Sequence, residues 1–286
     1  MKLKHLTILF ACLLASTALC EAGTLAQFRT VFGDIEVELY DQDKPVTVQN
    51  FIRYVQSGAY QNEFAHRLVP GFVIQGGGFT ITNGGTTNWD SVPIPTFPPI
   101  TNEFGVGRRF SNVFGTVAMA KLGGDTNSAT SQWYFNLADN TSLDANDTNN
   151  LFVVFGHVVR GTNVLNTFNQ FQYYDGTQSS NVVLYKWFVS PFDSLPELHP
   201  DLNLPYDTNL VYLSITVLQL SVRPQAGGRL LTWNSPAGMT NFLEYATNFP
   251  PVWTTLLQTN GTGAPISILD PAVADRSRLY RVRVSY

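Results

Sequence analysis

The stretch Phe64–Phe79 reads FAHRLVPGFVIQGGGF and combines a guanidinium, a carboxamide and a run of glycines with apolar side chains. Arg67 and Gln75 are eight residues apart, and in a β-strand an even spacing places both side chains on one face. The two polar groups are therefore expected to face one apolar space, although a plain sheet surface can show the same pattern. A phosphate-binding loop is not indicated, because no Gly-Lys-Ser/Thr follows Gly76–Gly78.

Two further blocks extend this signal along the chain. Gly115–Leu137 reads GTVAMAKLGGDTNSATSQWYFNL, and Leu151–Val158 reads LFVVFGHV. The three blocks, in this order, resemble the cyclophilin family of peptidyl-prolyl cis/trans isomerases, in particular its bacterial members. The resemblance implies a mostly β fold, a closed antiparallel eight-stranded barrel with two capping helices. It also implies an enzyme that rotates Xaa-Pro peptide bonds in polypeptides and requires neither a metal nor a cofactor.

The resemblance also assigns the residues of a site. Arg67 matches the catalytic arginine, whose permanently charged donors suit the prolyl nitrogen of a twisted amide. The matching substrate-binding positions are Phe72 and Val73 in the proline pocket, Gln75 on the substrate backbone, Ala120 in the backbone groove, Gln132 near the arginine, Tyr134 at the pocket base, and Leu143 and Phe152 at the rim.

Three positions depart from the usual pattern of the family. Tyr134 stands where a phenylalanine is usual, Phe152 where animal-type members have a histidine, and Ser142 where they have a tryptophan. A phenol in a proline pocket must either find a partner for its hydroxyl or narrow an apolar cavity. We therefore predict an altered substrate preference or a lower rate, with the Arg67 mechanism intact.

The first 22 residues have the composition of a secretory signal peptide. Two lysines precede the apolar run Leu6–Leu14, which is too short to span a bilayer, and small residues follow up to Ala22. We expect an exported protein, periplasmic or secreted, with no stable membrane insertion after cleavage. Cleavage as a lipoprotein before Cys20 is the weaker alternative, because the preceding Leu19 is bulky.

Composition excludes several classes of protein. Both cysteines, Cys12 and Cys20, lie within this segment, so the folded part has no disulfide and depends on core burial. The formal net charge is −4 and no basic run occurs, which argues against a nucleic-acid partner. Four scattered histidines do not predict a metal site, and no Gly-x-Ser-x-Gly motif indicates a hydrolase. Glu36 and Glu38 are interpreted as a solvated strand edge.

Periodicity predicts the remaining elements of residues 23–220, the expected isomerase domain. The alternation of apolar and polar residues predicts a hairpin over 26–40. The helical spacing of apolar residues predicts one helix from Pro45 to Gly58 and a short second helix capped by Thr162. The largely apolar run 210–220 predicts a closing strand. Residues 80–110 are rich in proline and are expected to form a surface loop, and 171–202 is expected to be irregular.

Residues 221–286 are expected to form a separate, small all-β module. Strand candidates at 230–233, 242–245, 253–257 and 279–284 are divided by Gly, Pro and Asn. Its aromatic residues can form a core or a sugar-binding platform, and strand spacing favours the core. They are Trp233, Phe242, Tyr245, Phe249, Trp253 and Tyr280.

Two functions remain open from the sequence. The first is an exported isomerase that assists the folding of other exported proteins. The second is a weakly catalytic or non-catalytic module that binds extended Pro-containing segments, with residues 221–286 as its targeting part. In both cases we expect a monomer.

Overall fold

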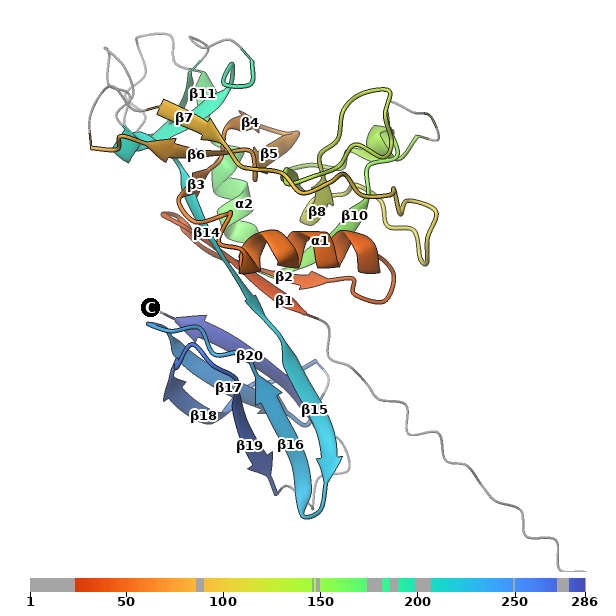
Figure 1. The fold of residues 1–286 in the computed structure, drawn as a ribbon, viewed down its shortest axis with the longest axis vertical. Helices are drawn as coiled ribbons and strands as arrows, with labels where there is room; N and C mark the ends of the chain where they lie inside the picture. Colours follow the sequence, from red (N-terminus) through yellow and green to blue (C-terminus); the bar gives the residue numbers. More distant parts are fainter. Residues whose placement is uncertain are drawn as a thin grey trace, which may run out of the picture.

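The computed structural model describes residues 24–85, 90–145, 147, 150–173, 182–185, 190–198, 207–248, 250–271 and 278–285. The predicted signal peptide lies outside these residues, as does Phe249. Figure 1 shows a strongly curled sheet with two helices and, beside it, a group of strands built from the C-terminal part of the chain.

Eleven strands form the main sheet. They are β1 (Leu25–Thr30), β2 (Gly33–Leu39), β3 (Glu63–Phe64), β4 (Arg67–Val69), β5 (Val73–Gly76), β6 (Phe79–Thr82), β7 (Asp90–Pro93), β8 (Thr116–Met119), β9 (Trp133–Asn136), β10 (Val154–Arg160) and β14 (Tyr212–Leu218). Their order is β4-β5-β9-β8-β10-β2-β1-β14-β3-β6-β7, and every pairing is antiparallel.

The sheet closes on itself through one bent segment. β3 pairs with β14, and β4, only two residues further along, pairs with β5 at the other end of the sheet. The bend itself is bonded to both sides, because the Ala65 N–H donates to Val211 O at 2.9 Å and the His66 N–H donates to Gln75 O at 3.1 Å. With β3 and β4 counted together and the β6–β7 hairpin set aside, the described ring has eight strands. The predicted mostly β fold with two helices and additional C-terminal sheets is confirmed.

Aromatic rings fill the inside of the ring. Phe28 on β1 contacts Phe51, Trp133 and Phe135, with ring centroids between 4.9 and 5.8 Å apart. All four side chains are at most 1% exposed, so this cluster excludes water. Burial of large aromatic side chains is a main contribution to the stability of a core.

The helix α1 (Pro45–Gln56) packs on this core through Val48, Phe51 and Ile52, as its spacing predicts. The first turn lacks a local cap and takes one from the long loop. The carboxylate of Glu103 accepts from the Val46 N–H at 3.1 Å and from the Thr47 N–H at 2.8 Å. A carboxylate at this place satisfies free N–H groups and complements the helix dipole.

The second helix, α2 (Thr162–Phe168), also packs on the core, and it corrects a prediction. Thr162 is the first helical residue and not the cap; Gly161 stands at the cap position with φ +95°. A Cβ at Gly161 would lie 2.3 Å from Asp34 O, so the close approach to the β1–β2 turn leaves room for glycine alone.

Two stretches expected to be irregular contain strands. The proline-rich loop 80–110 begins with β6 and β7, which form a hairpin. Because β7 is at the edge of the sheet, it tolerates Pro93, which has no N–H to donate to a further strand. The stretch 171–202 contains β11 (Gln172–Tyr173), β12 (Val182–Tyr185) and β13 (Leu195–Leu198) in one small sheet. The remaining short helices are the 3₁₀ turns η1 (Thr141–Asp144) and η2 (Asp207–Asn209).

The C-terminal part of the chain forms two three-stranded sheets. One has the order β15-β16-β19 and the other β18-β17-β20. The strands are β15 (Leu220–Gln225), β16 (Gly228–Trp233), β17 (Thr240–Ala246), β18 (Thr254–Asn260), β19 (Ile266–Asp270) and β20 (Leu279–Ser285). Their shared core includes Leu218 from β14, and one residue separates β14 from β15. The domain boundary at residue 220 stays a prediction.

The aromatic residues of these sheets have unequal roles. Trp233 is 1% exposed and belongs to the core. Phe242, Tyr245 and Trp253 are half-buried and each lies under a guanidinium. The carbon of the guanidinium is 3.8 Å from the Phe242 ring centroid, 4.0 Å from that of Tyr245 and 4.4 Å from that of Trp253. Arginines therefore cover the rings that an open sugar-binding platform would need to expose.

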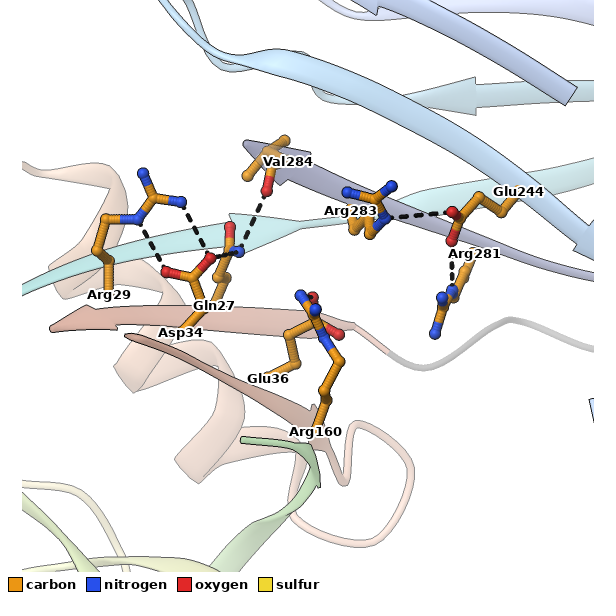
Figure 2. Close-up of polar contacts among 9 residues, drawn as sticks. All are labelled: Gln27, Arg29, Asp34, Glu36, Arg160, Glu244, Arg281, Arg283 and Val284. Carbon is orange, nitrogen blue, oxygen red and sulfur yellow. Dashed lines mark hydrogen bonds and ion pairs between the residues drawn. The ribbon is translucent and has the colours of Figure 1, made fainter. Parts of the chain in front are cut away.

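A polar contact joins the barrel to the C-terminal sheets (Figure 2). The Gln27 amide donates to Asp34 at 3.0 Å and to the carbonyl of Val284, on β20, at 3.2 Å. Arg29 donates twice to the same Asp34 carboxylate, at 2.9 and 3.0 Å. One amide thus connects a charged pair of the barrel to the backbone of β20.

Glu36 corrects another prediction, because it is not part of a solvated edge. It is 1% exposed and pairs with Arg160 of β10. Figure 2 places Glu244 of β17 across from this pair, where it is held by Arg281 at 2.7 Å and Arg283 at 3.1 Å. The hydrogen bond to Glu36 raises the pKa of Arg160, and Glu244 adds to the rise. The C-terminal sheets therefore alter the environment of this strand face, which no local pattern could indicate.

Candidate active site

The first candidate residues come together across a tight hairpin. β4 and β5 are antiparallel, and Arg67 is the direct partner of Gln75. The turn is closed by a hydrogen bond from the Phe72 N–H to Val69 O at 2.9 Å, with Gly71 at φ +72°. The two side chains share a face, as predicted, but for a different reason: they are opposite each other on paired strands and not eight residues apart on one strand.

An apolar pocket continues from this hairpin over the neighbouring strands. Gln75 pairs with Tyr134 of β9, Tyr134 with Ala118 of β8, and Ala118 with Val154 of β10. Side chains in such a row lie on the same face of a sheet, about 5 Å apart from one strand to the next. The cluster is made of the buried Val73, Ala118, Tyr134 and Val154, with Tyr40, Phe72, Phe110, Ala120, Leu143 and Phe152 packed against it.

The nine candidate residues lie in this cluster or beside it. Arg67 is half-buried, with its guanidinium carbon 5.9 Å from the Phe72 ring centroid. The amide of Gln75 donates to the Gln132 Oε1 at 2.6 Å, which holds the two carboxamides together beside the arginine. The Phe152 ring meets the Tyr134 ring edge-on, with centroids 5.9 Å apart.

Four lining residues were missed in the sequence. Ala118 and Val154 stand two positions from Ala120 and Phe152, so strand alternation could have indicated them. Tyr40 and Phe110, whose stacked rings are 3.8 Å apart, come from distant segments and have no such signal.

The hydroxyl of Tyr134 has a buried partner. It donates to Asn112 Oδ1 at 2.7 Å, and the Asn112 amide donates to Asp144 Oδ1 at 2.7 Å. The same Asn112 oxygen accepts from Asn136 at 3.1 Å. Burial raises the pKa of Tyr134 well above its usual value, and the charge of Asp144 adds to this, so the phenol stays a neutral donor. The ring can therefore present apolar surface while its hydroxyl points to the polar network beneath.

The histidine beside the arginine lies in the bend between β3 and β4 and is part of the interior. His66 is 1% exposed and packs edge-on against Phe79, with ring centroids 5.1 Å apart. Burial and the charge of Arg67 lower the pKa of His66 to about 4, although a hydrogen bond with Gln132 opposes the shift. It is therefore neutral near pH 7.

The described residues contain no group of three or more His, Cys, Asp or Glu side chains that could hold a metal ion. In the same part of the chain, no helix has the length and apolar character needed to cross a bilayer. The chemistry available at the site is that of a guanidinium, two carboxamides and an apolar pocket.

Known proteins resemble most of the barrel. The family model described as "Cyclophilin type peptidyl-prolyl cis-trans isomerase/CLD" matches residues 25–188. "Peptidyl-prolyl cis-trans isomerase A" of Dickeya dadantii is 42% identical over 143 residues, which cover 50% of this chain and 70% of that protein. "Peptidyl-prolyl cis-trans isomerase" of Acinetobacter baylyi is 39% identical over 163 residues, which cover 57% of this chain and 80% of that protein.

Among solved structures, a cyclophilin type peptidyl-prolyl cis-trans isomerase of Cryptosporidium parvum has 20% identity and a TM-score of 0.42, covering 68% of this chain and 98% of that one. The family match spans more than half of the 286 residues and contains the hairpin, the apolar pocket and the paired carboxamides. The chain therefore belongs to the cyclophilin-type peptidyl-prolyl isomerases and is an enzyme of that type.

Proposed function

We propose that this isomerase rotates Xaa-Pro bonds in exported proteins and so assists their folding in the periplasm or outside the cell. The lysines, the short apolar run and the small residues of the first 22 positions support export. The absence of cysteine after position 20 fits a protein whose folding does not depend on the redox state of its compartment.

We assign the catalytic role to Arg67. Rotation about the Xaa-Pro amide has a barrier of about 18–20 kcal/mol, because twisting removes the conjugation between nitrogen and carbonyl. The nitrogen regains its lone pair in the twisted state, and a guanidinium donor that meets it there stabilises that state more than the planar one. A water-poor surrounding strengthens this hydrogen bond.

The other residues position the substrate. Phe72, Val73 and Tyr134 take the proline ring, while the paired amides of Gln75 and Gln132 bind the substrate backbone beside the arginine. Ala120 lines the groove for the chain, and Leu143 and Phe152 form the rim. The single observation that carries this assignment is the direct pairing of Arg67 with Gln75 at the edge of the apolar pocket.

The test is the rate of cis-to-trans conversion of a short Xaa-Pro peptide by wild type and by Arg67→Ala. We expect a loss of about 100-fold or more in kcat/KM, the usual effect of removing a donor to a transition state. Arg53→Ala is a matched control, because Arg53 also lies over a phenylalanine ring, Phe97, at 3.6 Å but away from the pocket. Equal turnover by wild type and Arg67→Ala would contradict the assignment.

Export is tested separately by expressing the full chain in a bacterium and determining the N-terminus of the protein in each fraction. We expect a mature chain in the periplasm or medium that begins after Ala18 or Ala22. An uncleaved chain retained in the cytoplasm would contradict the proposal, and a lipid-modified N-terminus at Cys20 would favour the membrane-anchored alternative.

A further inference from the structure

Three buried polar atoms lie behind the site and have no hydrogen-bond partner among the described residues. They are Glu63 Oε1, His66 Nδ1 and Trp133 Nε1. All three side chains belong to residues that contact the glycine run Gly76–Gly78. Unpaired buried polar groups are costly, so their concentration at one place points to a function.

Glu63 holds the middle of this run directly. Its side chain is fully buried on β3, and its Oε2 accepts from the Gly77 N–H at 2.5 Å. Gly77 has φ +75°, and a Cβ there would lie 2.5 Å from Ser131 O and 2.8 Å from the Trp133 ring. The run therefore lies close between Glu63 and the segment 131–133, with no room for a Cβ at Gly77.

The run leads from Glu63 to the two carboxamides of the site. Gly76 ends β5, next to Gln75, and a Cβ at Gly78 would lie 3.3 Å from the amide carbon of Gln132. Gln132 in turn accepts from Gln75 at 2.6 Å. A displacement of Gly77 would thus move the backbone of Gln75 and the support of Gln132 together.

We infer that Glu63 is a positioning residue of the isomerase: its carboxyl group fixes the glycine run and, through it, the Gln75–Gln132 pair that binds the substrate backbone. The inference rests on the proposed assignment of these two glutamines to substrate binding. Glu63 does not reach the pocket itself, so its effect is indirect.

The surroundings of Glu63 favour the uncharged form. Its partners on the adjacent strands are Leu213 of β14 and Thr80 of β6, which do not titrate. Tyr60 donates to Ser131 O and is neutral because burial raises its pKa well above the usual value, and His66 is neutral as described. Burial also raises the pKa of Glu63 well above the usual range, opposed only by the Gly77 N–H.

The experiment compares Glu63→Gln and Glu63→Leu in the full chain, with steady-state kinetics on a short Xaa-Pro peptide. Glutamine keeps the acceptor for Gly77 without a charge, so kcat/KM should stay within about 2-fold of wild type. Leucine fills the space but removes the acceptor, so KM should rise by about 10-fold, the usual scale for one lost positioning hydrogen bond.

A matched control removes another fully buried carboxyl group, away from the glycine run. Glu197 on β13 is fully buried, both of its carboxylate oxygens lack a partner, and burial raises its pKa to about 8. Glu197→Leu should therefore change thermal stability but leave KM unaltered. If Glu63→Leu does not fold, Glu63→Val and Glu63→Thr, which have nearly the same shape and differ in the presence of a hydroxyl, replace it in the comparison.

Two results would overturn the inference: a folded Glu63→Leu with the KM of wild type, or a Glu63→Gln as impaired as Glu63→Leu. Gln132→Ala separates this failure from failure of the proposed site. If Gln132→Ala raises KM and Glu63→Leu does not, only the role of Glu63 is refuted. If Gln132→Ala has no effect on KM, the assignment of the glutamines to substrate binding is itself wrong.

Discussion

The hydroxyl of Tyr134 connects the base of the apolar pocket to a buried polar network. The phenol donates to Asn112, which is itself fixed by Asp144 and Asn136. A tyrosine at this place is therefore not an unsatisfied group in an apolar cavity, and its ring occupies the position expected of the family's phenylalanine. Because Asn112 accepts from the hydroxyl, a tyrosine can stand at this position without leaving a buried polar group unpaired.

We predict that Tyr134→Phe and Asn112→Ala have unequal effects. The first removes a hydroxyl and leaves Asn112 with its other partners, so stability and kcat/KM should change only by a few-fold. The second leaves the buried Tyr134 hydroxyl without an acceptor, which should destabilise the protein by about 1–3 kcal/mol and lower kcat/KM. The measurements are urea unfolding and turnover of a series of Xaa-Pro peptides.

The double variant provides the control for this pair. In the double variant no hydroxyl is left without an acceptor, so part of the stability and kcat/KM lost in Asn112→Ala should be recovered. Strictly additive effects would show that the hydrogen bond does not matter. A shift in Xaa preference in Tyr134→Phe would identify the hydroxyl as a specificity determinant.

At the scale of the element, α1 depends on a residue from the long loop for its first turn. Glu103 is 3% exposed, and its carboxylate accepts from two helix N–H groups and from the Thr47 hydroxyl at 2.7 Å. Nearby, the Lys44 ammonium donates to the Glu103 carbonyl at 2.9 Å and also to Val106 O. These contacts fix the middle of the segment 94–115, which connects β7 to β8, on the start of the helix.

We predict that Glu103→Ala lowers the free energy of unfolding by about 1–3 kcal/mol, since it removes a cap from a buried helix start. KM for a short peptide should stay at the wild-type value, because α1 packs on the inside of the ring and not on the pocket. Denaturant unfolding and kinetics check both parts. Glu38→Ala, an exposed carboxylate near His157, is the control and should be close to neutral.

At the scale of the whole molecule, the C-terminal sheets are joined to the barrel by both apolar and charged contacts. Leu25 and Leu218 of the barrel strands contribute to the core of the C-terminal sheets. Figure 2 shows the charged contacts, with Glu244 and its two arginines facing the Glu36–Arg160 pair. These contacts lie on β2 and the end of β10, while the pocket lies on the outer face of β5, β9, β8 and the start of β10.

We predict that Glu244→Lys strongly destabilises this junction. The change places a third cation beside Arg281 and Arg283 and near Arg160, and an uncompensated buried charge costs about 3–5 kcal/mol. Calorimetry should show a lower Tm and a broadened or divided transition, while KM for a short peptide stays unchanged. Glu244→Gln should have a smaller effect, and a single transition at the wild-type Tm in Glu244→Lys would refute the prediction.

Much of the fold was accessible from the sequence, because alternation and helical spacing report local burial. The hairpin of β1 and β2, the stripe of α1 and the closing strand β14 all follow from such patterns. The strands β6, β7, β11 to β13, β15 and β19 were missed, since proline and mixed composition concealed short strands whose formation depends on pairing with a neighbouring strand.

By itself the sequence determined the family, because the side chains that such chemistry requires stand in three blocks whose order is visible in the chain. It also predicted nine candidate site residues, eight of them within these blocks and Leu143 between the second and the third. Only the tertiary structure decided which of them contact one another, that Asn112 satisfies Tyr134, that Glu103 caps α1 and that Glu36 is buried. The physical reason is that these contacts join residues far apart in the chain. A hydrogen bond or an ion pair depends on distance in space, and local periodicity carries no information about it.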